Sequence, residues 1–299
     1  MELQHLTTFI TIAKIGSFTK AAEILDYAQS SVSAHVRALE EELEVRLFER
    51  LGREVSLTEE GKRLFIYAEQ LLKLAEETKE SVTGNTLPKG TLTIGAPESL
   101  CTFMLPSILQ EYRKRFPKVK LVLKLGSCRE ILAWLKKNII DIAFLLDTPL
   151  NIPDLISENL CHEQFSLISG TTRKLTNNDV VEPGDLQGED LLLIEEDGCC
   201  YRMIFESILA ESGVHPGSIQ EFGSVETIKR CTISGLGISI LPRIAVEDEI
   251  NRGLLKELPW KAPDFNIYTQ VLYHKHKWLS PSMAAIIELS KQMIDSCKE

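Results

Sequence analysis

Side chains that bind phosphates and base edges gather between residues 27 and 39, a stretch with no acidic residue. Four glutamates follow between residues 40 and 44. Hydroxyl, amide and guanidinium groups are the protein groups that most often contact nucleic acid. On a helix, one side of this stretch carries Ser30, Ser33, Ala34 and Arg37, with His35 at its edge. The pattern predicts a helix whose first half approaches DNA, although a merely solvated helix face would look similar.

The opposite side of the same helix is apolar. Val32, Val36, Leu39 and Leu43 are spaced by four, three and four residues, which is typical of a face packed on a core. Upstream, residues 3 to 25 predict two shorter helices separated by Gly16, and either Ser17 or Thr19 caps the second. Two helices joined by a tight turn at residues 26–29 predict a helix-turn-helix.

The helix-turn-helix geometry explains the charge pattern. In such motifs the start of the second helix enters the major groove, and its dipole favours phosphate there. Acidic residues would be repelled from that first half and tolerated in the second. Residues 50 to 58 then predict a two-stranded wing that turns at Gly52, with Arg50 and Arg53 close to the DNA backbone, although both could be ordinary surface arginines.

A long helix is expected from residue 59 onward, capped by Thr58 and followed by a breaker-rich segment at 83–90. Its apolar positions recur at near-heptad spacing, which favours a partner helix and therefore a dimer. Packing on its own domain is the alternative. The positions are Leu64, Ala68, Leu71, Ala75 and Val82.

These residues carry a family resemblance. Residues 1–66, and above all "FITIAKIGSFTKAAEILDYAQSSVSAHVRALEEELEVRLFERLGREVSLTEEGKRL", resemble the DNA-binding domain of LysR-type transcriptional regulators. Ser30, Glu44 and Glu60 depart from the usual proline, glycine and alanine, and the first departure could alter operator preference. The resemblance implies a homodimer or dimer of dimers on double-stranded DNA, with RNA polymerase as a further candidate partner. By resemblance, the DNA-binding residues are Gln29, Ser30, Ser33, Ala34, His35, Arg37, Arg50 and Arg53.

The remaining residues alternate strand and helix patterns, which predicts parallel α/β sheets in two similar lobes. The expected fold is α/β with an N-terminal all-α winged helix-turn-helix domain. The resemblance adds that the effector domain is similar to type II periplasmic binding proteins, and that a late strand returns to the first lobe. The expected divisions are 1–58 for DNA binding, 59–90 for the linker helix and hinge, 91–161 plus 267–299 for lobe I, and 162–266 for lobe II.

A ligand cleft is expected where strands end and helices begin. A helix start offers free N–H groups, so a small organic anion is favoured as effector, although nearby Glu98, Glu130 and Asp147 could equally favour a cation or a zwitterion. Ser99 and Ser127 could instead be simple helix caps. The candidate effector-binding residues are Ser99, Leu100, Ser127, Cys128, Asp147, Cys199, Cys200, Arg202, Glu226 and Thr227.

The adjacent cysteines Cys199 and Cys200 raise a redox alternative. The segment "EEDGCCYR" is similar to the peroxide-sensing branch of the same family, and a thiol near a helix start has a lowered pKa. That branch needs a second cysteine about nine residues later, where this chain has Leu209. A thiol that only lines the cleft or core is therefore favoured.

Other classes of function find little support. The sequence has no catalytic motif and no metal-ligand spacing beyond a lone pair of histidines, so we expect no enzyme, no cofactor and no metal. It has no export signal and no membrane span, so a cytoplasmic location is expected. A net charge of -10 does not exclude DNA, because phosphate contacts need only a local face. The rivals are a cytosolic solute-binding protein or enzyme of that fold, and a protein-protein interaction module.

Overall fold

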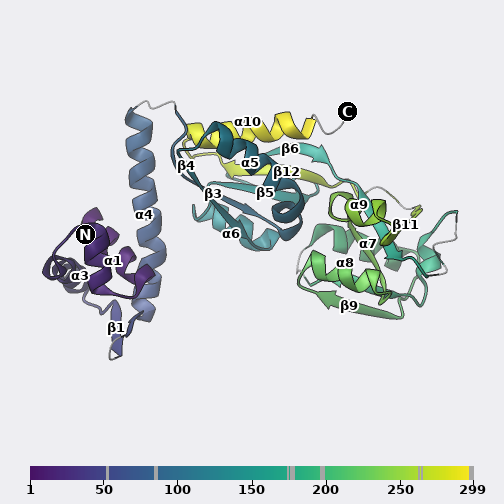
Figure 1. Cartoon of the computed structure of the whole chain (residues 1–299), viewed down its shortest axis with the longest axis horizontal. Coiled ribbons are helices and arrows are strands. Elements are labelled where there is room, and N and C mark those ends of the chain that lie inside the picture. Colours follow the sequence, from purple (N-terminus) through teal and green to yellow (C-terminus); the bar gives the residue numbers. More distant parts are fainter. Residues whose placement is uncertain are drawn as a thin grey trace. The chain divides into compact units, whose positions relative to one another are not determined.

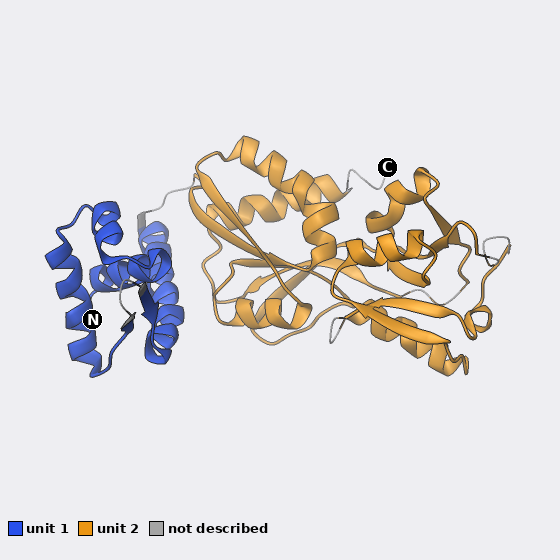
Figure 2. Cartoon of the chain, turned by 60° about the horizontal axis from the view of Figure 1, so that its bottom comes forward, with its two compact units in different colours: residues 1–85 blue, residues 86–299 orange. Residues whose placement is uncertain are grey.

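The computed structural model describes residues 1–51, 54–83, 87–173, 175, 179–195, 199–261, 263 and 265–295. Contacts divide the chain into two compact units, residues 1–85 and 86–299 (Figure 2). The boundary falls in the breaker-rich segment at 83–90. The acid-free stretch therefore belongs to unit 1, and the alternating strand and helix patterns belong to unit 2.

Unit 1 begins with α1 (Leu3–Ile15), α2 (Phe18–Leu25) and α3 (Gln29–Leu43). Gly16 ends α1 with a φ of 69°, a left-handed conformation that glycine adopts without strain. Ser17 then caps α2 by accepting a hydrogen bond from the Lys20 N–H. Ala21 and Ala22 are buried and let α2 approach its neighbours closely. The predicted helix-turn-helix is thus formed by α2 and α3.

The wing and the long helix complete unit 1. β1 (Phe48–Leu51) pairs antiparallel with β2 (Glu54–Leu57). Thr58 caps α4 (Glu59–Thr83) as expected, because its Oγ1 accepts from the Gly61 N–H at 2.9 Å. The same hydroxyl donates to the Arg46 carbonyl at 2.7 Å, which ties the start of α4 to the segment after α3.

The expected seam of α4 divides between two environments. Leu64 and the fully buried Ala68 pack into the core of unit 1, which was the alternative to a partner helix. Leu71 is instead 38% exposed. A set of large apolar side chains lies exposed along the helix: Ile66, Tyr67, Leu71, Leu74 and Val82.

Unit 2 contains two sheets, each the centre of one lobe (Figure 1). The lobe I sheet has the order β4-β3-β5-β12-β6. Its strands are β3 (Gly90–Ala96), β4 (Val119–Leu125), β5 (Ile142–Asp147), β6 (Leu155–His162) and β12 (Tyr268–His274). Its helices are η1 (Leu100–Met104), α5 (Leu105–Arg115), α6 (Cys128–Lys136) and α10 (Pro281–Asp295).

The lobe II sheet has the order β11-β7-β10-β8-β9. Its strands are β7 (Phe165–Gly170), β8 (Asp190–Ile194), β9 (Ser218–Phe222), β10 (Ile238–Pro242) and β11 (Leu255–Leu258). Its helices are η3 (Pro183–Leu186), α7 (Cys200–Glu211), α8 (Val225–Ile233) and α9 (Arg243–Asn251).

Both sheets are mixed, whereas the sequence pattern predicts parallel sheets. β3 runs parallel to β4 and β5, but β12 runs antiparallel to β5 and β6. In lobe II, β8 is parallel to β9 and β10, while β7 is antiparallel to β10 and β11. The reversed strands are β12 in lobe I and β7 in lobe II, and each follows a crossing between the lobes. The chain enters lobe II between the end of β6 at His162 and the start of β7 at Phe165, and β12 brings it back into lobe I.

Alternation along the central strand β5 fixes the layers of lobe I. Ile142 and Phe144 belong to the main core with α5 and α10, whereas Ala143 and Leu145 belong to a separate cluster under α6. The sheet is therefore covered on both faces, which explains the nearly continuous apolar sequence of this strand. The main core cluster extends from lobe I into lobe II, so the lobes share buried apolar contacts.

Candidate nucleic-acid interface and effector cavity

The first half of α3 presents the face that the sequence predicts for DNA. Gln29, Ser30, Ala34 and Arg37 are exposed, and Ser33 is half-buried among them. The other face of the helix is fixed, because Val32, Val36 and Leu39 are buried in the core of unit 1. Packing on one side thus holds the small polar residues on the other.

The N-terminus of α3 is free of negative charge. Ala28 stands at the N-cap position, makes no side-chain cap and leaves the first turn without an acidic residue. The uncompensated N–H groups of a helix start carry about half a positive charge and attract phosphate. This end of α3 is therefore suited to bind an anion from outside the chain.

His35 lies differently from the other predicted DNA contacts. Its Nδ1 is 2.9 Å from the Thr8 hydroxyl oxygen, and its ring stacks at 4.7 Å from that of His5 on α1. Burial lowers the pKa of His35, and the neighbouring His5 lowers it further. The side chain thus joins α3 to α1, and we leave it out of the proposed DNA-contacting set.

Of the three arginines predicted to contact DNA, Arg37 has a described side chain. Arg37 Nε lies 2.6 Å from a Glu41 carboxylate oxygen, and its side chain is 80% exposed, so the pair is held only loosely in water. Arg50 is in β1, where its backbone pairs with Val55, and its side chain is outside the described part. Arg53 lies outside the described residues.

A cavity of about 300 Å³ lies between the two lobes of unit 2. It is lined by residues at strand ends and helix starts, as the sequence argument expects. Five predicted effector residues line it: Ser99, Ser127, Cys128, Cys199 and Cys200. The other lining residues are Pro97, Glu98, Leu125, Gly126, Glu130, Leu146, Ile194, Glu195, Tyr201, Gly223 and Val225.

The other predicted effector residues lie outside this lining. Leu100 is fully buried in the core. Arg202 donates to the Ile194 carbonyl at 2.6 Å and pairs with Glu206 and Glu221. Asp147 Oδ1 accepts hydrogen bonds from the Thr148 N–H at 2.8 Å and from the Thr148 hydroxyl at 3.3 Å. Glu226 pairs with Lys229 and Arg230, and Thr227 donates its N–H to the Ser224 hydroxyl.

Two helix starts at the cavity already carry carboxylates of the chain. Ser127 and Glu130 form a capping box at the start of α6, in which Glu130 Oε2 accepts from the Ser127 N–H at 2.9 Å. These bonds hold the pKa of Glu130 below its ordinary value. At α8, Glu98 accepts from the Val225 N–H at 2.7 Å and the Ser224 hydroxyl at 2.8 Å. Cys199 at the start of α7 makes no side-chain cap.

The cysteine pair has the chemistry of buried thiols. Cys200 Sγ donates a hydrogen bond to the Leu146 carbonyl of lobe I at 3.0 Å. Burial raises the pKa of the Cys200 thiol, and the charge of Asp147 raises it further. A thiolate is the reactive form, so this environment does not activate Cys200 toward oxidants.

In the described part of the chain, no group of histidines, cysteines and carboxylates is arranged to hold a metal ion. Among the same residues, none of the helices combines the length and apolar character needed to cross a bilayer.

Comparison with known proteins agrees with both units. Residues 3–62 match the model "Bacterial regulatory helix-turn-helix protein, lysR family", and residues 85–295 match the LysR substrate binding domain. The transcriptional regulator YwqM of Bacillus subtilis is 42% identical over 98% of this chain and 99% of its own. The regulator GltR of the same organism is 31% identical over 96% of this chain and 95% of its own.

A solved structure supports the fold. Full-length CbnR, crystallised with its target DNA, has a TM-score of 0.69 over 98% of this chain and 99% of its own, at 20% identity. The expected winged helix-turn-helix and two-lobed α/β architecture is thereby confirmed, and the matched relatives are regulators rather than enzymes. The chain belongs to the LysR family of DNA-binding transcriptional regulators and carries that family's substrate-binding domain for a small-molecule effector.

Proposed function

We propose that this regulator reads its operator with the N-terminal half of α3 and responds to a small organic anion held between the lobes of unit 2. The single observation that carries the DNA part is the start of α3. It is exposed, uncapped and free of acid, in a chain whose net charge is -10. Phosphate is attracted to such a helix start, while the four glutamates that follow remain outside the groove.

The proposed contacts are divided between bases and backbone. Gln29, Ser30, Ser33, Ala34 and Arg37 lie on the exposed face and would reach base edges and phosphates in the major groove. Arg50 and Arg53, on the wing, would contact the backbone in the flanking groove. Which bases are read depends on the operator, which a genome-wide binding experiment would identify.

Self-association is proposed through α4. Its exposed apolar side chains include Tyr67 at 64% and Leu74 at 54% exposure, and a helix that carries such residues is stabilised by a partner helix. A dimer, or a dimer of dimers, would present two α3 helices to two operator half-sites. Such a protein acts on the chromosome in the cytoplasm, and beside a promoter it would also lie within reach of RNA polymerase, which we include as a further partner.

The anionic effector is supported by the start of α7. This helix begins at the cavity and its N-cap residue makes no side-chain cap, and the dipole of a helix start attracts a carboxylate. The lining also contains Glu98, Glu130 and Glu195. Two of these carboxylates already lie on helix starts, where the helix dipole offsets their charge. An effector would bind one arrangement of the lobes better and shift the protein toward it.

A salt titration of DNA binding tests the proposed function. The full-length protein and a duplex recovered by genome-wide binding would be mixed at several salt concentrations, and the dissociation constant measured by fluorescence anisotropy. The logarithm of affinity should fall linearly with the logarithm of salt concentration, because neutralised phosphates release counterions. Absence of duplex binding at low salt would instead favour a solute-binding protein with a helical extension.

A further inference from the structure

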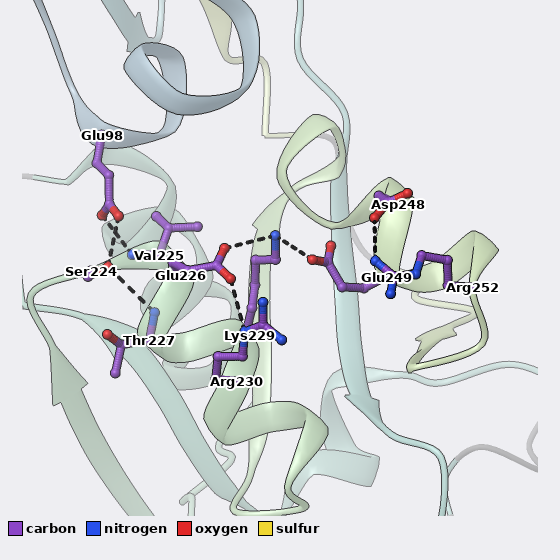
Figure 3. Close-up of polar contacts among 10 residues, drawn as sticks. All are labelled: Glu98, Ser224, Val225, Glu226, Thr227, Lys229, Arg230, Asp248, Glu249 and Arg252. Atoms are coloured by element: carbon purple, nitrogen blue, oxygen red, sulfur yellow. Dashed lines mark hydrogen bonds and ion pairs between the residues drawn. The ribbon is translucent and has the colours of Figure 1, made fainter.

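The carboxylate of Glu98 connects the two lobes of unit 2. Glu98 follows β3 in lobe I, and its two oxygens accept from the Ser224 hydroxyl at 2.8 Å and the Val225 N–H at 2.7 Å in lobe II (Figure 3). These residues are 126 and 127 positions apart in the sequence. The contact is therefore a property of the lobe arrangement and not of local chain geometry.

Glu98 occupies the place that an anion takes at a helix start. Val225 is the first residue of α8, so its N–H has no partner within the helix and points at the incoming charge. Ser224 donates its hydroxyl proton to Glu98 and accepts from the Thr227 N–H, which aligns both groups. The arrangement is that of a bound carboxylate, with the carboxylate supplied by the chain itself.

The hydrogen bonds of Glu98 to the other lobe distinguish it from the other two carboxylates that line the cavity. Glu130 caps its own helix, α6, through Ser127 three residues away, so it would remain in place whatever the lobes do. Glu195 is exposed and directly follows β8, which ends at Ile194. Glu98 alone among these three lining carboxylates hydrogen-bonds from one lobe to the other.

The helix that receives Glu98 is held firmly along its side. The Lys229 Nζ lies 2.8 Å from Glu249 and 3.1 Å from Glu226 in lobe II, and 4.7 Å above the ring centre of Phe103 in lobe I (Figure 3 shows the ion pairs). Lys229 is 3% exposed, so these contacts are shielded from water. α8 therefore keeps its position while the group on its N-terminus could exchange.

The segment that carries Glu98 is less regular. η1 begins two residues later as a π-helical turn leading directly into α5. Such turns are rare and often lie at functional sites.

We propose that Glu98 is an interlobe latch, a carboxylate of the chain that holds the anion position at the start of α8 until the effector's own carboxylate replaces it. The inference rests on the proposed function, since it names how the effector acts at the same cavity. Replacement would break both hydrogen bonds from Glu98 to lobe II and leave Ser224 and Val225 bonded to the ligand. Effector binding and the loss of the Glu98 contact between lobe I and the start of α8 would then be one event, while Phe103 of lobe I stays against Lys229.

The test compares full-length wild-type protein with Glu98→Ala and Glu98→Gln. Sodium acetate and sodium succinate serve as carboxylate probes, ethylamine hydrochloride as a cationic probe, and sodium chloride keeps the ionic strength constant. Binding is followed by calorimetry, and hydrogen exchange by mass spectrometry reports on residues 97–104 and 222–228. Glu195→Ala is the matched control, because it removes the same charge from the same cavity without touching α8.

The latch predicts a gain of affinity. If it is closed in about nine of ten molecules, its removal in Glu98→Ala raises carboxylate affinity about tenfold, with a smaller rise for Glu98→Gln. In the wild type, succinate should speed exchange in 97–104 while 222–228 stays protected. Glu195→Ala should change affinity by less than about fivefold, as expected for an exposed charge.

Two results would overturn the latch. One is carboxylate affinity that is the same in Glu98→Ala, Glu98→Gln and the wild type. The other is ethylamine binding that the wild type shows and Glu98→Ala loses, which would make Glu98 the counterion of a cationic effector. Neither result touches the salt-dependent DNA binding, so failure of the latch is separated from failure of the DNA-binding part of the proposed function. If hydrogen exchange changes as predicted but the protein does not bind duplex DNA, only the proposed DNA-binding function is overturned.

Discussion

The helices α3 and α8 begin in opposite electrostatic states. The start of α3 has no side-chain cap and no acid in its first turn, whereas that of α8 has Ser224, Glu226 and the carboxylate of Glu98. Every helix start has N–H groups that need a partner. The chain satisfies this need internally at α8 and leaves it open at α3, where a partner from outside can bind. The contrast separates a surface for DNA from a contact within the protein.

The largest effect is expected from breaking the internal charges of α8. Lys229→Met leaves Glu249, 7% exposed, without its cation, which should lower the free energy of unfolding of unit 2 by about 3–5 kcal/mol. Urea unfolding of the full-length protein, followed by circular dichroism, measures the loss.

The matched control is Lys229→Met combined with Glu249→Met. Replacing a whole buried ion pair by apolar residues is often close to neutral, so most of the stability should return. Equal losses in the single and the double variant would contradict the view that α8 depends on this pair.

The second effect concerns the open start of α3. Ser33→Glu combined with Arg37→Glu places two acids on the exposed face, where like charges facing phosphate cost several kcal/mol. Duplex affinity should fall by about a hundredfold or more at constant salt, measured by anisotropy.

The control for this prediction is Lys256→Glu, which changes the net charge in the same direction on an exposed strand of unit 2. It should leave affinity nearly unchanged, because the proposed DNA contacts all belong to unit 1 and Lys256 belongs to unit 2. A comparable loss in both proteins would mean that total charge, and not the start of α3, governs binding.

The smallest effect tests the charge beside the cavity. Burial raises the pKa of Asp147 above its ordinary value of 3.8, against the hydrogen bonds from Thr148. The folded state thus binds this proton more tightly than the unfolded state, so the group favours folding below pH 3.8 and opposes it as pH rises through the folded pKa. Asp147→Asn should raise the melting temperature at pH 7 by about 2 °C or less.

The same variant should give a much smaller gain at pH 3.5, just below the ordinary pKa of 3.8, since the wild-type carboxyl group is then mostly protonated. Scanning calorimetry at the two values of pH makes the comparison. A gain of equal size at both would assign the effect to packing and not to charge.

Local features of the sequence were enough to predict unit 1. The spacing of Val32, Val36 and Leu39 reports one packed face, and their burial confirms it. The acid-free face needs no distant residue to be recognised. His35 lies at the edge of that face and contacts Thr8 of α1, a partner that its position in the sequence does not reveal, and its role at DNA stays a prediction.

Unit 2 was less predictable because its contacts are distant in sequence. Helix starts were found correctly, and Ser127 and Cys199 do line the cavity. Which way a side chain leaves a helix start depends on its rotation relative to the sheet, and Arg202 and Glu226 form ion pairs outside the cavity lining, so their contact with an effector stays a prediction. Glu98 stands beside Ser99 in the sequence, but its partner Ser224 is 126 residues away and leaves no local trace.

The central claim is tested most directly by crosslinking from two positions of α3. Ala34 and Glu41 are seven residues apart, close to two turns, so they share a face and differ in which half of the helix they occupy. Each would be replaced in turn by p-benzoylphenylalanine and irradiated on the recovered duplex. We expect crosslinks to DNA from position 34 and few from position 41. Stronger crosslinking from position 41 would contradict a groove filled by the first half of α3.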